Sequence, residues 1–193
     1  MRKWKRVDTA DGARFRSALD SHEAALLKNL VASMIGLLEE RESSSPHDEL
    51  EQITGMKTGN SEPPDNATLQ RLLPDFTKPN DGAAPDDQAA GSLNAALRSL
   101  HEPSIIDAKK VAAQQLLDTL PAGGGKLELS EDAAHAWTSA VNDLRLALGT
   151  MLDIRPDGPD RLPDDHPLAA HLDVYQWLTV LQEYLVLALM GSG

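Results

Sequence analysis

The sequence predicts a mainly α fold, a helical bundle around a buried C-terminal helix with a small antiparallel β-sheet. Only seven of the 193 residues are Phe, Trp or Tyr, so we expect an aliphatic core of the kind found between packed helices. Long stretches carry apolar residues at the spacing i, i+3, i+4 and i+7, which is typical of one helix face. Short alternating stretches near the start and at residues 126–129 predict strands. We expect a single domain over residues 1–193.

The small sheet is expected to come mainly from an N-terminal hairpin. Residues 4–7 and 13–19 are strand-like, and Asp11-Gly12 between them tolerates the positive φ of a tight turn. In the second strand the apolar side chains lie on one face, and Arg14 and Arg16 lie on the other. Residues 126–129, KLEL, alternate in the same way and are expected to add a third strand.

Helices are expected after the hairpin. The first is predicted to begin at a cap formed by Asp20 or Ser21 and to run to about residue 40, with Glu23 completing a capping box if Asp20 is the cap. Two shorter helices are expected over residues 46–54 and 66–73.

The middle of the chain is expected to contain a linker and three further helices. Residues 78–91 have no aliphatic side chain larger than Ala and are rich in Pro, Gly and Asp, which predicts a flexible internal linker. Helical patterns follow over residues 92–103 and 104–120, with Pro103 expected to separate them. A further helix is predicted over residues 130–153, followed by a proline-rich loop.

The last predicted helix, residues 172–190, is apolar on nearly all sides. Such a helix is either buried or spans a membrane, but the apolar run after Glu183 is far shorter than the roughly 20 residues that a spanning helix needs. We therefore expect a core helix and no membrane association. Glu183 within it is expected to pair with Arg145 or to lie at an exposed edge.

Charge is distributed unevenly along the chain. There are 30 acidic and 18 basic residues, giving a net charge of −12, so the chain as a whole is repelled by nucleic acid and anionic membranes. The first 16 residues instead contain six basic and two acidic groups. The candidate residues for binding a partner or nucleic acid are Arg2, Lys3, Trp4, Lys5, Arg6, Arg14 and Arg16.

Two interpretations of this basic hairpin stay open. Its cations could contact phosphate, because a two-stranded ribbon can enter the major groove of DNA. Alternatively, they could meet acidic groups of the same protein or of a partner protein.

No pattern in the sequence indicates an enzyme, a metal site or a cofactor. There is no Cys, and the six His residues do not have metal-ligand spacing. Gly123 to Gly125 precede a strand, whereas the glycines of a phosphate-binding loop precede a helix, and no GxSxG motif occurs. Charged residues interrupt any signal-peptide core after the basic start, so we expect a cytoplasmic protein.

Five blocks of the sequence resemble one family: MRKWKRV, ARFRSAL, HEAALLKNLVASMIGLLEER, NAALRSLHEPSIIDAKKVAAQQLLDTLP and HPLAAHLDVYQWLTVLQEYLVLALMGS. They are similar to the actinobacterial oxidative-stress regulators of the AosR family, long described as a domain of unknown function and encoded next to the Clp adaptor ClpS. The similarity covers nearly the whole chain except residues 78–91. The blocks are specific in sequence but are core-like helices rather than a site.

The resemblance implies a non-enzymatic regulator that controls transcription during oxidative stress, including cysteine biosynthesis, together with a stress sigma factor. We therefore expect contacts with a sigma factor or RNA polymerase, and we leave open direct contact with promoter DNA and formation of homo-oligomers. The alternative is an accessory protein of Clp-dependent protein quality control. The family's proposed redox switch is a cysteine pair, which this chain lacks, so a thiol sensor is excluded here.

Overall fold

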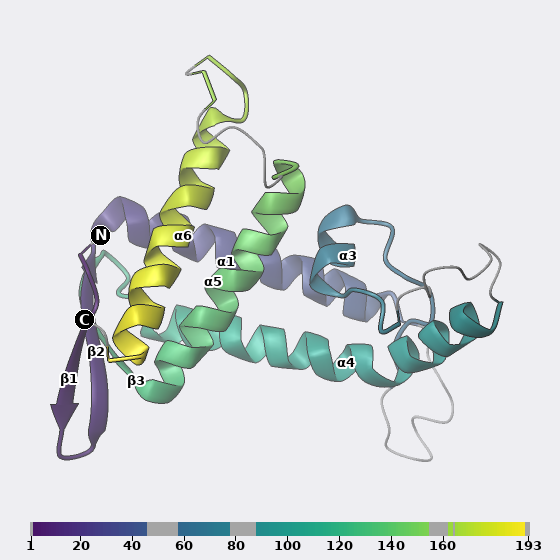
Figure 1. Ribbon diagram of the computed structural model, residues 1–193, viewed down its shortest axis with the longest axis horizontal. Coiled ribbons are helices and arrows are strands. Elements are labelled where there is room, and N and C mark those ends of the chain that lie inside the picture. The colour runs from purple at the N-terminus through teal and green to yellow at the C-terminus, as the bar shows by residue number, and fades with distance from the viewer. Residues whose placement is uncertain (1, 46–57, 78–87, 155–161, 164, 192–193) are drawn as a thin grey trace.

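The computed structural model describes residues 2–45, 58–77, 88–154, 162–163 and 165–191, and it confirms a mostly helical fold with a small three-stranded sheet (Figure 1). The elements, in chain order, are β1 (Lys5–Thr9), β2 (Gly12–Leu19), α1 (Ser21–Ser43), α3 (Ala67–Leu72), α4 (Gln88–Thr119), β3 (Gly125–Ser130), α5 (Glu131–Met151) and α6 (Ala169–Leu189). The expected hairpin, third strand and C-terminal helix are all present.

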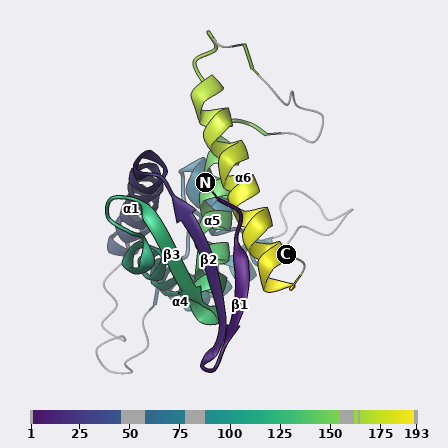
Figure 2. The same ribbon diagram turned by 90° about the vertical axis from the view of Figure 1, so that its left-hand side faces the viewer.

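The sheet has the order β1-β2-β3, and both pairs of strands are antiparallel (Figure 2). Phe15 in β2 lies opposite Leu129 in β3, and both side chains are fully buried on the inner face, where α5 contacts these strands. Side chains alternate between the two faces of a strand, so Lys5, Arg16 and Glu128, which lie side by side in the register, occupy the outer face. The sheet therefore has an apolar inner face and a charged outer face.

The start of α1 is fixed by the predicted capping box. Asp20 is the cap: its Oδ1 accepts from the backbone N–H of Glu23 at 2.8 Å, and its own N–H donates to the Glu23 carboxylate at 2.9 Å. Gly124, in the turn before β3, packs directly against this cap, because an added Cβ would lie 2.6 Å from the carbonyl carbon of Asp20. Gly124 also has a φ of +75°, so a side chain is disfavoured there twice over.

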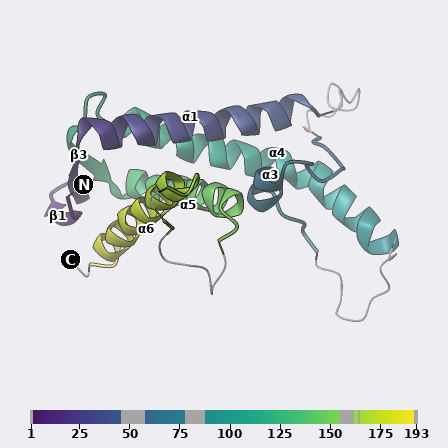
Figure 3. The same cartoon turned by 90° about the horizontal axis from the view of Figure 1, so that it is seen from above.

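Helix α5 lies at the centre of the packing. It contacts α1, α3, α4 and α6 as well as the inner face of the sheet, and its Trp137 is fully buried. The long helices α1 and α4 lie side by side, α5 packs against both of them, and α6 packs against α5 (Figure 3).

Helix α6 packs against α5, as expected of the C-terminal helix, but it is buried along one face only. Leu178, Leu181 and Leu185 point into the core, whereas Val180 and Leu187 are each 38% exposed. An apolar sequence pattern indicates where burial is favourable and does not show how much of a helix its neighbours cover.

The expected pairing of Glu183 with Arg145 does not form. Glu183 is exposed, which is the second of the two positions expected for it. Arg145 instead donates to Gln182 at 2.6 Å and to Thr179 at 3.0 Å on α6.

The expected separation of two helices at Pro103 is wrong, because α4 runs through it without interruption. Of the predicted linker at residues 78–91, residues 78–87 lie outside the described residues, and the last four belong to the first turn of α4. The helix expected at residues 46–54 also lies outside the described part, whereas the one expected at 66–73 is present as α3. No helix among the described residues is both long and apolar enough to cross a membrane.

Candidate functional site

Basic residues gather around a hollow on the outer face of the sheet, with a volume of about 580 Å³. We call it the basic hollow, and it is lined by Arg2, Lys3, Lys5, Arg16, Ser17, Ala18, Lys126, Leu127 and Glu128. Five of these residues are cationic and one is acidic, in a chain whose net charge is −12.

Strand register brings these residues together. Lys5, Arg16 and Glu128 form one row across the three strands, and the next row places Lys126 opposite Ala18. The small side chain of Ala18 leaves room between the long cationic side chains around it. The segment before β1 continues along β2, because the Arg2 N–H donates to the Ala18 carbonyl at 3.0 Å and the Ser17 hydroxyl donates to the Arg2 carbonyl at 2.6 Å.

The charges in the basic hollow are only partly neutralised. Glu128 accepts a hydrogen bond from Arg16, and its other carboxylate oxygen lies 3.9 Å from Nε of Arg14. Within the described part of the chain, the side chains of Arg2, Lys5 and Lys126 form no ion pair. These three positive charges are available to an anionic group from outside the protein.

The structure divides the seven candidate residues predicted from the sequence. Arg2, Lys3, Lys5 and Arg16 line the basic hollow. Arg14 lies on the same face beyond the lining, where it approaches Glu128. Arg6 lies opposite Phe15, so its side chain leaves the strand on the other face, and it pairs with Asp8 at 3.1 Å.

Trp4 is buried, so the structure does not bring its side chain together with the cationic candidates on the outer face. It is only 4% exposed, and its ring packs edge-on against Trp137 of α5 with the ring centroids 5.7 Å apart. The physical reason is the alternation along the strand: Lys3 and Lys5 flank Trp4 on the outer side, and Trp4 itself points into the core.

Lys126 is a lining residue that the sequence interpretation missed. The alternation of KLEL already places Lys126 and Glu128 on one face and Leu127 and Leu129 on the other. The sequence predicted a third strand here but not that it pairs with β2, because the two strands are far apart in the sequence.

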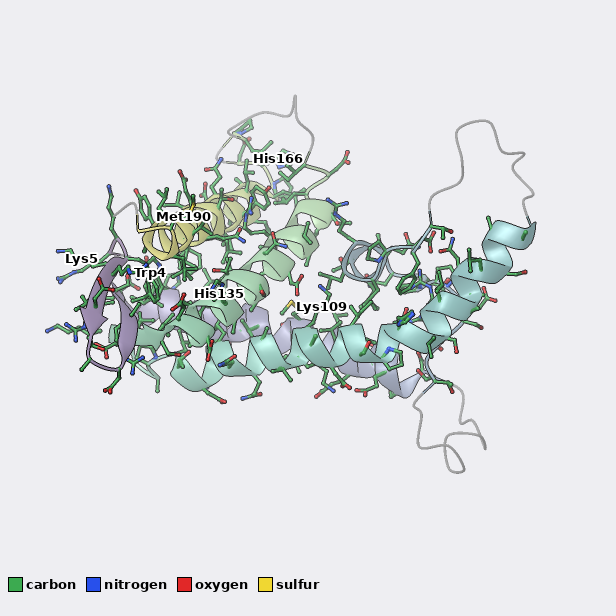
Figure 4. The ribbon with its side chains drawn as sticks, turned by 60° about the horizontal axis from the view of Figure 1, so that its bottom comes forward. Trp4, Lys5, Lys109, His135, His166 and Met190 are labelled. Carbon is green, nitrogen blue, oxygen red and sulfur yellow. The ribbon has the colours of Figure 1, made fainter. Side chains whose placement is uncertain are left out.

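Lys3 connects the basic hollow to helix α6. Its ammonium group lies 5.1 Å from the centre of the Tyr184 ring, a distance at which a cation is attracted to the face of an aromatic ring. The C-terminal half of α6 lies beside β1 (Figures 2 and 4). The basic hollow therefore continues onto the surface of this helix.

A second, smaller pocket of about 450 Å³ lies between α4 and α5. Its charged groups are Lys109 and Asp143, which pair at 2.7 Å and so leave no net charge to select an ionic ligand. No group of three or more His, Cys, Asp or Glu that could hold a metal ion occurs among the described residues.

Comparison with known proteins identifies the family to which this chain belongs. The model of a domain of unknown function, DUF2017, matches residues 1–189. The chain belongs to this family. A protein from Mycobacterium tuberculosis named oxidative stress regulator AosR is 68% identical over 195 residues, covering 100% of this chain and 89% of the relative. A Mycobacterium leprae relative, whose name also includes AosR, is 64% identical over 195 residues, covering 100% of this chain and 90% of that protein.

The family resemblance seen in the sequence blocks is thus confirmed over the whole chain. The M. tuberculosis relative is named as a regulator and not as an enzyme. No solved structure matches the chain.

Proposed function

We propose that this protein is a non-enzymatic, cytoplasmic regulator of transcription during oxidative stress, acting through contacts with a sigma factor or RNA polymerase. The observation that carries the proposal is the basic hollow, where five cations surround one carboxylate in a strongly acidic protein. The names of the DUF2017-family relatives support the connection to oxidative stress.

The electrostatic contrast favours a protein partner with a local acidic surface. Free cations beside an otherwise repulsive protein select partners whose negative charge is confined to one region, because a larger anionic surface also meets the acidic remainder of this chain. Duplex DNA presents closely spaced negative charge over its whole length. We therefore favour a protein of the transcription machinery over promoter DNA as the direct partner.

The absence of Cys separates this regulator from one that responds through its own thiols. Its activity is then set by the availability of its partner or by a partner that carries the redox-sensitive group.

The test is fluorescence anisotropy of the purified protein with a labelled promoter fragment of an oxidative-stress gene and a scrambled fragment, across a salt series. Each titration is made with and without RNA polymerase carrying a stress sigma factor. We expect no sequence-specific binding by the protein alone and a shift of the polymerase–promoter complex when the protein is added.

Specific, salt-sensitive binding of the protein alone would instead make it a direct DNA-binding regulator. No effect in either titration, together with co-purification of Clp protease, would overturn the proposal in favour of a role in protein quality control.

A further inference from the structure

One side of α6 beside the basic hollow carries exposed apolar side chains. We call it the α6 outer face; its apolar members are Val180 and Leu187, each 38% exposed, and Met190 at the C-cap, which is 72% exposed. The exposed Glu183 lies among them, three residues after Val180 and four before Leu187. Val180 and Leu187 are seven residues apart, so they lie about 20° from each other around the helix. Clustered apolar side chains on a protein surface mark interaction sites more often than isolated ones do.

The α6 outer face and the basic hollow are continuous. Tyr184 lies four residues after Val180 and three before Leu187, so its ring is next to both on the helix surface. Lys3, which lines the basic hollow, holds its ammonium group 5.1 Å from the centre of that ring. Figure 4 shows Met190 and Lys5 at the same end of the molecule.

We propose that the basic hollow and the α6 outer face form one docking surface for an amphipathic, acidic helix of a partner protein. The carboxylates of that helix contact Lys3, Lys5 and Lys126, and its apolar residues cover Val180 and Leu187. The inference rests on the proposed function, because it names the kind of segment in the transcription machinery that the regulator binds.

Charge and apolarity together favour this occupant over nucleic acid. A phosphate backbone has charge but no apolar stripe to cover the α6 outer face. An amphipathic helix offers both surfaces at once, since its apolar and charged residues follow the same helical period.

A second copy of this chain fits less well. In a two-fold symmetric contact the same patch meets itself, so the five cations of one hollow would approach the five of the other. Like charges brought together in this way oppose association.

The experiment places a photo-reactive benzoylphenylalanine in the full chain, in cells under oxidative stress, at one of three positions: Lys5, Leu187 or Val111. Val111 is 65% exposed on α4 and serves as the control for an exposed apolar position. Mass spectrometry then identifies the cross-linked segment. We expect positions 5 and 187 to cross-link to the same acidic, amphipathic helix of one protein, and position 111 not to do so.

Cross-links from both positions to DNA, to another copy of this chain, or to a segment without acidic and apolar faces would overturn the proposal. Yields at positions 5 and 187 no higher than at position 111 would overturn it as well.

Variants that place a glutamate at a surface position separate this inference from the proposed function. Binding to sigma-loaded polymerase is measured for Lys5→Glu and Leu187→Glu, with Lys28→Glu on α1 and Val111→Glu as matched controls. We expect the first two to weaken binding by about tenfold or more and the controls to leave it unchanged.

Polymerase binding that is equally strong in all four variants would retain the proposed function and remove this docking surface. An acidic helix captured from a protein outside the transcription machinery would retain the surface and remove the proposed function.

Discussion

The backbone N–H of Gly59 donates to the carbonyl of Ser99 at 2.8 Å, inside the long helix α4. In a regular helix this carbonyl accepts from the residue four positions later, which here is Pro103 and has no N–H. Gly59 therefore supplies the donor that the proline lacks. Its α-carbon also lies so close to the proline ring that an added Cβ would be 2.9 Å from Cγ and Cδ of Pro103.

The first prediction concerns this contact. Gly59→Ala should lower the free energy of unfolding by about 1–3 kcal/mol, because the new methyl group must displace the ring or break the hydrogen bond to Ser99. Urea unfolding followed by circular dichroism measures the change.

The matched control is Gly36→Ala in α1, where a Cβ would meet no atom within 4 Å. Alanine favours a helix by about 1 kcal/mol over glycine, so this variant should be as stable as the parent or more stable. Equal stability of the two alanine variants would show that Gly59 is not in close contact with Pro103.

The same contact explains why one helix boundary could not be predicted. A proline inside an apolar helical pattern ends many helices, and the compensating donor comes from Gly59, which is remote in sequence. The cap of α1 could be predicted, because Asp20 and Glu23 are three residues apart and satisfy each other's backbone groups locally.

In the candidate site, too, features set by neighbouring residues could be predicted from the sequence, and features set by distant residues could not. The alternation of charged and apolar residues located the outer face of β2 correctly. The contribution of Lys126 depends on its pairing with Ala18, and the burial of Trp4 depends on the position of Trp137. Neither long-range neighbour is encoded in a short stretch of sequence.

A second prediction concerns a buried group of charges between α1 and α4. The Glu102 carboxylate accepts from Arg98 at 2.6 Å and from Arg41 at 2.7 Å, and the side chains of Arg98 and Glu102 are almost fully buried. Glu102→Ala should destabilise the protein by about 1–3 kcal/mol, because the buried Arg98 loses one of its two carboxylate partners and keeps only Asp75 at 2.7 Å.

Asp8→Ala is the control, because the Asp8–Arg6 pair is exposed and should contribute less than about 1 kcal/mol. Thermal unfolding of both variants compares them under the same conditions. Similar melting temperatures would contradict the burial of Glu102.

The third prediction distinguishes packing from hydrogen bonding at Trp4. Its indole N–H is buried and has no partner among the described residues, so the ring contributes through packing alone. Trp4→Ala should cost about 3–5 kcal/mol, whereas Trp4→Phe should cost about 1 kcal/mol or less, because Phe keeps an aromatic ring against Trp137 and removes the unpaired donor. Chemical denaturation of the two variants tests this, and equal losses would indicate a hydrogen bond to the indole.

The fourth prediction is a pH dependence at Lys110. A hydrogen bond from its ammonium group to Glu42, 2.8 Å long, raises the pKa of Lys110 above the ordinary value of 10.5. A raised pKa means that the pair stabilises the folded protein fully below pH 10.5 and loses this contribution as the pH rises through the folded-state value. The contribution is less than about 1 kcal/mol, because both side chains are partly exposed.

Titration of lysine side chains labelled with ¹³C, followed by NMR, measures this pKa directly. In Glu42→Gln the Lys110 resonance should titrate at lower pH than in the parent protein. An unchanged midpoint would mean that Glu42 does not hold the ammonium group in solution.

The last prediction separates the basic hollow from the set of cations chosen by sequence alone. Substitution of Arg2, Lys3, Lys5 and Arg6 together by Ala should abolish partner binding. Arg6 should contribute nothing to this loss, because its side chain pairs with Asp8 on the other face of the sheet. Lys126→Ala should weaken binding to sigma-loaded polymerase by about three- to tenfold, because Lys126 has no ion-pair partner in the described part of the chain. Arg6→Ala should leave the affinity unchanged. Isothermal titration at two salt concentrations compares the two single variants, and a larger loss for Arg6→Ala would place the binding surface on the opposite side of the sheet.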